Sequence, residues 1–161
     1  MTSPTEPSVP ILQLSRRFDA PRGLVFEAWS HPAHLVRWWG PKDFTLPVCR
    51  QDFRPGGAYR FCMRAPDGSD HWVWGLYREI IEPERLVFTW QRNDETGLRR
   101  GLNSLVTVTL TEEGRHTRLT LTQESFQTVA DRDDHHSGWT QCLDRLDLHL
   151  LDQALNPRNI P

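Results

Sequence analysis

The sequence lacks the features that mark several large protein classes. It contains only three cysteines, Cys49, Cys62 and Cys142, and they form no Cys-x-x-Cys pair. An odd number of widely spaced cysteines argues against a disulfide framework or a zinc ribbon and is typical of a reducing compartment, so we expect a cytoplasmic protein. The first ten residues hold no apolar run, so no signal peptide is predicted. No apolar stretch of about 18 residues predicts a membrane span.

An excess of positive charge is absent as well. Nineteen Lys and Arg residues stand against 21 Asp and Glu residues, which gives a formal net charge of −2. Because a nucleic-acid-binding protein normally carries a basic patch or stripe, we predict no nucleic-acid partner.

The motifs of common catalytic and metal sites are also missing. The sequence contains no Gly-x-Ser-x-Gly, no glycine-rich phosphate loop and no His-Glu-x-x-His. Cys62 and Cys142 stand in apolar patterns and are expected to be inert core thiols. His135 and His136 follow several acidic residues, but neighbouring helix positions do not face one side, which favours a solvated helix start over a metal site. We therefore predict no catalytic residue, no metal and no cofactor.

The periodicity of the remaining sequence predicts one strand, two short helices, six strands and a long helix. Alternation marks the first strand, from Ile11 to Phe18, and Pro21 and Pro32 each allow a helix to start. Six alternating segments follow from Phe44, with a polar loop over 92–101. Steps of three and four residues from Asp133 to Leu155 predict a long amphipathic helix. We expect a single domain over 10–155, between a flexible N-terminal tail, 1–9, and a C-terminal tail, 156–161.

A meander of antiparallel strands with one apolar face needs a cover, and only the final helix is long enough to provide it. The predicted fold class is therefore α+β, a curved antiparallel sheet of six to seven strands wrapped around the long C-terminal helix.

This order of elements resembles the START-like, or SRPBCC, superfamily with the helix-grip fold. Within it, the chain is most similar to the family of homologues of the heat-shock-protein-90 ATPase activator. The similarity covers roughly residues 10 to 152. The matching segments are Arg17-Phe18-Asp19-Ala20-Pro21, Val25-Phe26-Glu27-Ala28-Trp29, Pro32, Leu35, Trp38-Trp39-Gly40-Pro41, Arg54-Pro55-Gly56-Gly57-Ala58-Tyr59-Arg60, Gly75-Leu76-Tyr77-Arg78-Glu79-Ile80, Pro83-Glu84-Arg85-Leu86-Val87-Phe88-Thr89-Trp90, and Gly138-Trp139 with Leu143 and Leu146.

The resemblance implies a fold and leaves the function open, because the superfamily includes lipid carriers, polyketide cyclases, hormone receptors and co-chaperone domains. Its motifs are turn and core residues and carry no catalytic group. The eukaryotic activators also have a separate N-terminal domain that engages the chaperone. Only the nine residues of the tail precede the domain predicted here, which argues against co-chaperone activity.

Seven tryptophans and seven phenylalanines are available to line a cavity between the sheet and the helix, or to fill a solid core. Trp38 and Trp39 either form the rim of a pocket or anchor the short helices, and their adjacency on a helix argues against both being core. Gly138 inside the long helix indicates either close helix–sheet packing or access to a cavity. The candidate cavity-lining residues are Trp38, Trp39, Phe61, Met63, Trp72, Trp74, Phe88, Trp90, Trp139, Leu143 and Leu146.

Three functions remain open at this stage. The first is non-enzymatic binding of a small apolar or aromatic molecule by a monomer or homodimer. The second is a polyketide cyclase or dehydratase-like enzyme, for which Asp52, His71, Glu79 and Gln123 are the candidate polar groups. The third is a protein-interaction domain whose partner is a chaperone.

Overall fold

The computed structural model describes residues 10–93 and 99–155. The predicted tails, 1–9 and 156–161, lie outside the described residues, as do residues 94–98 of the predicted 92–101 loop.

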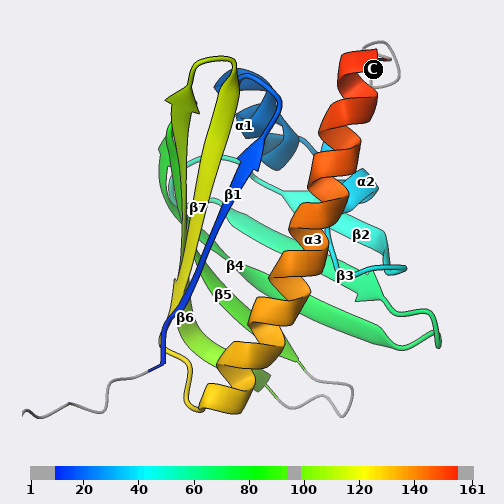
Figure 1. Ribbon diagram of the computed structural model, residues 1–161. Coiled ribbons are helices and arrows are strands. Elements are labelled where there is room, and N and C mark those ends of the chain that lie inside the picture. The colour runs from blue at the N-terminus through cyan, green and yellow to red at the C-terminus, as the bar shows by residue number, and fades with distance from the viewer. Residues whose placement is uncertain (1–9, 94–98, 156–161) are drawn as a thin grey trace, which may run out of the picture.

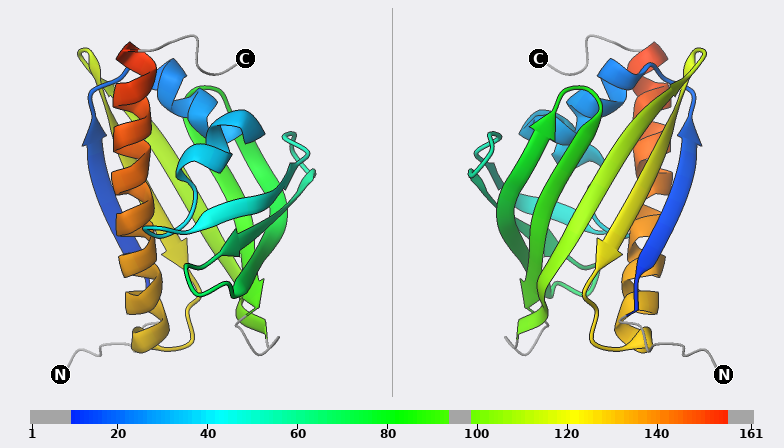
Figure 2. Two further views of the ribbon diagram at one scale, coloured as in Figure 1. Left: turned by 90° about the vertical axis from the view of Figure 1, so that its right-hand side faces the viewer. Right: turned by 90° about the vertical axis from the view of Figure 1, so that its left-hand side faces the viewer.

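Seven antiparallel strands form one sheet, in the spatial order β1-β7-β6-β5-β4-β3-β2. The long helix α3 crosses the open side of this curved sheet, and the short helices lie at the end where α3 finishes (Figures 1 and 2). This arrangement confirms the predicted helix-grip fold. In chain order the elements are β1 (Leu12–Phe18), α1 (Arg22–Ser30), α2 (Pro32–Trp38), β2 (Thr45–Gln51), β3 (Ala58–Arg64), β4 (Asp70–Ile81), β5 (Arg85–Asn93), β6 (Arg99–Glu113), β7 (His116–Glu124) and α3 (Val129–Leu155).

The predicted apolar stripe of α3 is buried, from Trp139 through Leu143 and Leu146 to Leu150. The helix begins at Val129, earlier than the predicted Asp133. The Thr128 hydroxyl accepts a hydrogen bond from the Asp131 backbone N–H at 3.0 Å, and this capping contact permits an additional first turn.

Strands β5 and β6 continue into the segment predicted to be a loop. β5 ends at Asn93 and β6 begins at Arg99, where the pairs Asn93–Arg99 and Arg92–Arg100 extend the ladder. The prediction of a loop was therefore wrong at both of its ends, because backbone pairing between β5 and β6 does not depend on an apolar sequence pattern.

The orientation predicted for β4 was also wrong. Trp72 and Trp74 were placed on the core face, but they stand opposite Cys62 and Arg60 of β3, on the convex face of the sheet. The Arg60 guanidinium lies 4.1 Å from the centre of the Trp72 ring, a cation–π contact. Val73 and Tyr77 face the core instead. Because this strand is apolar on both faces, alternation alone cannot choose its orientation.

Candidate functional site

A cavity of about 390 Å³ lies beside the first turns of α3, partly open to solvent. Its other walls are the segment that follows α2 and the concave face of β3, β4 and β5. The lining residues are Trp39, Gly40, Pro41, Phe44, Met63, His71, Trp90, Arg92, Asp134, His135, Ser137, Gly138, Trp139, Gln141 and Cys142. The volume lies within the range of roughly 300–1,000 Å³ that is usual for small-molecule sites.

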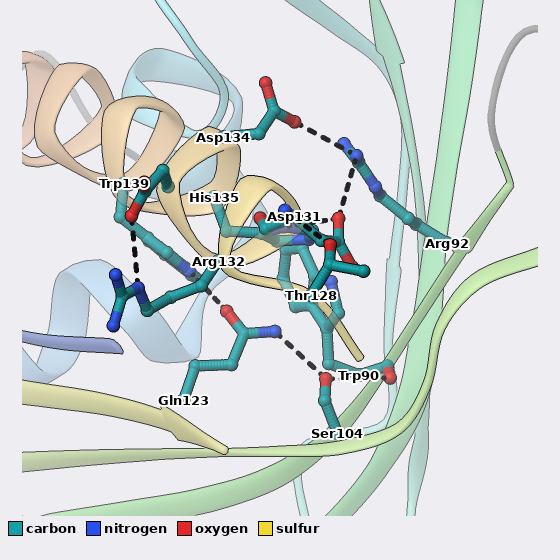
Figure 3. A network of polar contacts seen from close by, with 11 residues as sticks. Trp90, Arg92, Ser104, Gln123, Thr128, Asp131, Arg132, Asp134, His135 and Trp139 are labelled. Carbon is teal, nitrogen blue, oxygen red and sulfur yellow. Dashed lines mark hydrogen bonds and ion pairs between the residues drawn. The ribbon is translucent and has the colours of Figure 1, made fainter. Parts of the chain in front are cut away.

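Three tryptophans from three different elements form the apolar wall. The ring centre of Trp139 lies 5.4 Å from that of Trp39 and 5.3 Å from that of Trp90. Trp139 Nε1 donates to Gln123 Oε1 at 2.8 Å, and Gln123 Nε2 donates to Ser104 Oγ at 3.0 Å (Figure 3). The buried amide of Gln123 therefore fixes the plane of the Trp139 ring against the sheet.

Trp38 and Trp39 are both buried, which corrects the expectation that only one of them is core. Trp38 is the last residue of α2, whereas Trp39 has an extended backbone, with φ −69° and ψ 134°. The helical angle between neighbours therefore does not apply to the pair. Trp38 Nε1 donates to the Ala28 carbonyl at 3.0 Å and joins the short helices, while the Trp39 ring reaches the cavity.

One guanidinium of α3 contacts three successive carbonyl oxygens of the segment that starts at Trp39. Arg145 Nη1 lies 3.3 Å from the carbonyl oxygen of Trp39 and 3.1 Å from those of Gly40 and Pro41. Gly40 has a φ of +106°, which glycine adopts without strain. These contacts hold one wall of the cavity at a fixed distance from the helix.

Gly138 belongs to the cavity and not to a close helix–sheet contact. A Cβ added at this position would meet only Pro41 Cγ, at 4.0 Å. Of the two readings of this glycine, the structure therefore favours access to the cavity.

The polar end of the cavity is built around an ion pair between β5 and α3. Arg92 Nη2 lies 3.1 Å from Asp134 Oδ2 and 3.8 Å from Asp131 Oδ1 (Figure 3). The Arg92 guanidinium thus pairs with both carboxylates, so the formal charge of Arg92, Asp131 and Asp134 together is −1.

His135 lies beside this ion pair and is buried, which corrects its placement in a solvated helix start. Its ring packs between Phe126 and Trp90, with ring centres 4.8 and 6.0 Å away. Its Nδ1 lies 2.9 Å from the Asp131 backbone oxygen, so Nδ1 carries the proton and Nε2 presents a lone pair. Burial, followed by the positive charge of Arg92, lowers the pKa of His135.

Three buried polar atoms of cavity-lining residues have no hydrogen-bond partner among the described residues. They are Trp90 Nε1, Arg92 Nε and His135 Nε2. Buried polar groups are nearly always paired, so these three atoms are exceptions, and each lies behind the cavity surface with almost no accessible area.

Four of the eleven candidate residues line the cavity: Trp39, Met63, Trp90 and Trp139. Trp38, Phe61, Phe88, Leu143 and Leu146 are buried in the core outside it, and Trp72 and Trp74 are on the convex face. Beyond Trp39 the core is filled, since the void among residues such as Phe61 and Phe88 measures only about 10 Å³.

The polar lining was only partly anticipated. His71 and Gln123 were candidate polar groups; His71 lines the cavity, and Gln123 supports Trp139 from behind. Asp52 pairs instead with exposed Arg54, and Glu79 with Arg85. Arg92 and His135 were missed. The i, i+4 spacing of Asp131 and His135 with Trp139 would have placed the histidine on the buried stripe of α3.

The thiol of Cys142 also borders the cavity. Its Sγ accepts a hydrogen bond from the Gly40 backbone N–H at 3.3 Å, and burial raises the pKa of this thiol to about 12. It is therefore protonated at neutral pH and is not an activated nucleophile. Among residues 10–93 and 99–155, no group of three His, Cys, Asp or Glu side chains is placed to hold a metal ion.

A helix-grip domain with an aromatic cavity between sheet and helix is the class that this structure defines. A family model described as "Activator of Hsp90 ATPase homolog 1-like protein" matches residues 19–150. The chain belongs to this family, as the resemblance predicted.

Solved structures of bacterial proteins share the fold. The AHSA1 protein SPO3351 from Silicibacter pomeroyi is 27% identical, with a TM-score of 0.79 over 89% of this chain and 99% of that one. Protein CV1439 from Chromobacterium violaceum is also 27% identical, with a TM-score of 0.77 over 88% of this chain and 97% of that one. Protein NE0264 from Nitrosomonas europaea, 22% identical, has a TM-score of 0.78 over 94% of this chain and 99% of that one. A comparison with curated proteins gave no match.

Within the part of the chain that the structure describes, no helix is both long and apolar enough to cross a membrane.

Proposed function

We propose that this protein binds a small, largely apolar or aromatic molecule in the cavity between the sheet and α3. The observation that carries the proposal is the 390 Å³ cavity, which lies against the cluster of Trp39, Trp90 and Trp139 beside a core that is otherwise filled. The packed, rigid rings of this cluster form an apolar wall that loses little side-chain entropy when a flat ligand binds against it.

An NMR titration with fatty acids, flavonoids and polyketide-like aromatics tests this proposal. We expect saturable shifts of the indole N–H signals of Trp39, Trp90 and Trp139. Trp72 and Trp74 provide internal controls, because they are on the convex face. Shifts confined to Trp72 and Trp74, or no shifts with any compound, would contradict the proposal.

Proton-transfer chemistry is a second candidate, favoured by the neutral imidazole of His135 in the cavity wall. After a rotation of the ring that exposes the buried Nε2, this nitrogen would accept a proton from a carbon next to a ligand carbonyl and return one to the same carbon. The test is deuterium exchange into an enolisable bicyclic ketone such as 2-tetralone in D₂O, by the wild type and by His135→Phe. Exchange no faster than in buffer would leave binding without chemistry.

A chaperone partner is a third candidate, favoured by a row of exposed leucines on α3. Leu148, Leu151 and Leu155 lie at spacings of three and four residues, on the face turned away from the sheet. The test is the ATPase rate of heat-shock protein 90 with the wild type and with the charged variant Leu148→Glu. Equal rates with the wild type, with the variant and with no added protein would remove this candidate.

A further inference from the structure

The imidazole of His71 is a polar group between apolar neighbours in the cavity wall. His71 belongs to β4 and stands opposite Met63 of β3, on the concave face of the sheet. Its ring is half-buried, and its centre lies 5.8 Å from the centre of the Phe44 ring. Both neighbours line the cavity together with His71. The hydrogen bonds of this imidazole therefore decide what one wall of the cavity offers to a ligand.

A chain of two hydrogen bonds fixes the tautomer of the ring. Ser69 Oγ donates to Asp67 Oδ1 at 2.7 Å and lies 3.0 Å from His71 Nε2. The hydrogen bonds from the Ser69 hydroxyl and then from its backbone N–H lower the pKa of Asp67, so this carboxylate is ionised and can only accept. Because the single hydroxyl hydrogen of Ser69 is used there, His71 Nε2 must donate to Ser69 Oγ. In the neutral ring, the lone pair is therefore on Nδ1.

Nδ1 is the nitrogen of His71 that remains available to a ligand. The one hydrogen bond of this ring within residues 10–93 and 99–155 is made by Nε2. Nδ1 is also absent from the set of unpaired side-chain atoms that have almost no accessible surface in that part of the chain, a set that includes His135 Nε2. An unpaired atom outside this set keeps accessible surface, so Nδ1 can accept a hydrogen bond without a rotation of the ring.

An accessible acceptor in a largely apolar wall discriminates among ligands. An aromatic ligand without a donor displaces water from the acceptor and leaves it unpaired, which costs free energy. A ligand with an N–H or O–H group replaces the lost bond to water. An ether or a carboxylate offers only lone pairs, so it cannot make this bond.

We infer that His71 Nδ1 is the hydrogen-bond acceptor for the ligand, and that the ligand is an aromatic compound with a donating N–H or O–H group, as in an indole or a phenol. This inference rests on the proposed function and adds the chemistry of the ligand and the residue that recognises it. The aromatic rings of the ligand lie against the cluster of Trp39, Trp90 and Trp139, and its donor is directed to the wall formed by β4, because all four side chains line one cavity.

Two pairs of probes test the inference: indole with 1-methylindole, and 2-naphthol with 2-methoxynaphthalene. In each pair a methyl group removes the donor and keeps the ring. The titrations use calorimetry and NMR at pH 8.0, where imidazole groups are usually neutral. Given the usual contribution of one hydrogen bond, the member with the donor should bind about fivefold more tightly in at least one pair. The ¹⁵N signal of His71 Nδ1 should move further with that member than with its methylated partner.

Two variants assign the preference to this imidazole. His71→Phe keeps a ring beside Phe44 and removes the acceptor, so the preference should fall to unity or below while the methylated probes bind within about twofold of the wild type. Ser69→Ala removes the partner of Nε2, so the ¹⁵N signals of the two ring nitrogens should move toward each other as the tautomers mix, and the preference should decrease. His136→Phe is the matched control, because His136 is exposed and does not line the cavity; it should leave the preference unchanged.

The outcomes separate this inference from the proposed function. A preference in one pair only would support the inference and would identify the donor as an N–H or as an O–H. Equal affinities within both pairs would overturn the inference and leave the apolar site in place. A preference that persists in His71→Phe would also overturn it, since another acceptor would then be responsible. If none of the four probes binds, the proposed function fails together with the inference.

Discussion

Glycine at position 138 lowers the stability of α3 but keeps the cavity open. Glycine in a helix interior costs about 1 kcal/mol relative to alanine, and no steric requirement for glycine exists here, because an added Cβ would lie 4.0 Å from Pro41 Cγ. The glycine therefore preserves open space that a larger side chain would occupy.

We predict that Gly138→Ala raises the free energy of unfolding by about 0.5–1 kcal/mol. Gly138→Leu should reduce ligand affinity at least about tenfold, since its side chain would extend into the cavity. Urea denaturation and calorimetry measure the two effects. Gly23→Ala in α1 is the matched control, because its Cβ would meet nothing within 4 Å. It should raise stability by less, because Gly23 lies in the first turn of α1, and should leave affinity unchanged. A Gly138→Leu variant that binds as the wild type does would contradict the assignment.

At the scale of elements, the segment between α2 and β2 depends on α3 for its position. Arg145 Nη1 contacts three successive carbonyl oxygens of this segment, and the Lys42 N–H donates to Gln141 Oε1 at 3.0 Å. The Gly40 N–H also donates to Cys142 Sγ, so three side chains of α3 hold this wall of the cavity, and the Arg145 guanidinium makes three of the contacts.

Replacing Arg145 by methionine, which keeps an apolar stem, should release this wall. We predict a loss of about 1–2 kcal/mol in unfolding free energy, because the hydrogen bonds from the guanidinium disappear. Amide hydrogen exchange at Phe44, whose N–H bonds to the Pro41 carbonyl at 3.1 Å, should accelerate about tenfold. Arg132→Met is the control, since Arg132 pairs with the neighbouring Asp133 on an exposed part of α3. Unchanged exchange at Phe44 in the Arg145 variant would show that the segment is held by its apolar contacts.

The sequence predicts the order of the helices and strands better than it predicts which face of a strand is buried. The order of strands and helices could be predicted because hydrophobic periodicity reports one buried face, as in the stripe from Trp139 to Leu150. It fails where both faces are apolar, which is why Trp72 and Trp74 were assigned to the wrong side of β4. The polar end of the cavity could not be predicted, because it joins Arg92 of β5 to His135 of α3, and periodicity carries no information about which distant side chains meet.

For the whole molecule, the buried histidines connect pH to stability. His34 Nδ1 and His149 Nε2 lie 2.8 Å apart where α2 packs against α3, and both rings are buried. Burial, followed by the neighbouring His34, lowers the pKa of His149 to about 4, and burial also lowers the pKa of His34. The Arg37 charge lowers both values, while Glu27 opposes the shift at His34 and Asp152 opposes it at His149.

These lowered pKa values fix the direction of the pH dependence. A histidine with a folded-state pKa below its unfolded value, about 6.5, binds fewer protons when folded, so its contribution to stability is complete above that pH. The contribution is lost as the pH falls from about 6.5 to about 4, where His149 protonates in the folded state. We predict that the free energy of unfolding decreases by about 1–2 kcal/mol between pH 7 and pH 5. Most carboxylates titrate below this pH range, and the predicted energy allows for solvent screening.

His149→Gln, which cannot titrate, should flatten this decrease in urea denaturation, whereas His136→Gln on the exposed side of α3 should leave it unchanged. A wild-type stability that is constant from pH 7 to pH 5 would show that the paired histidines take up protons in the folded state as readily as in the unfolded chain, and that the α2–α3 contact tolerates their charge.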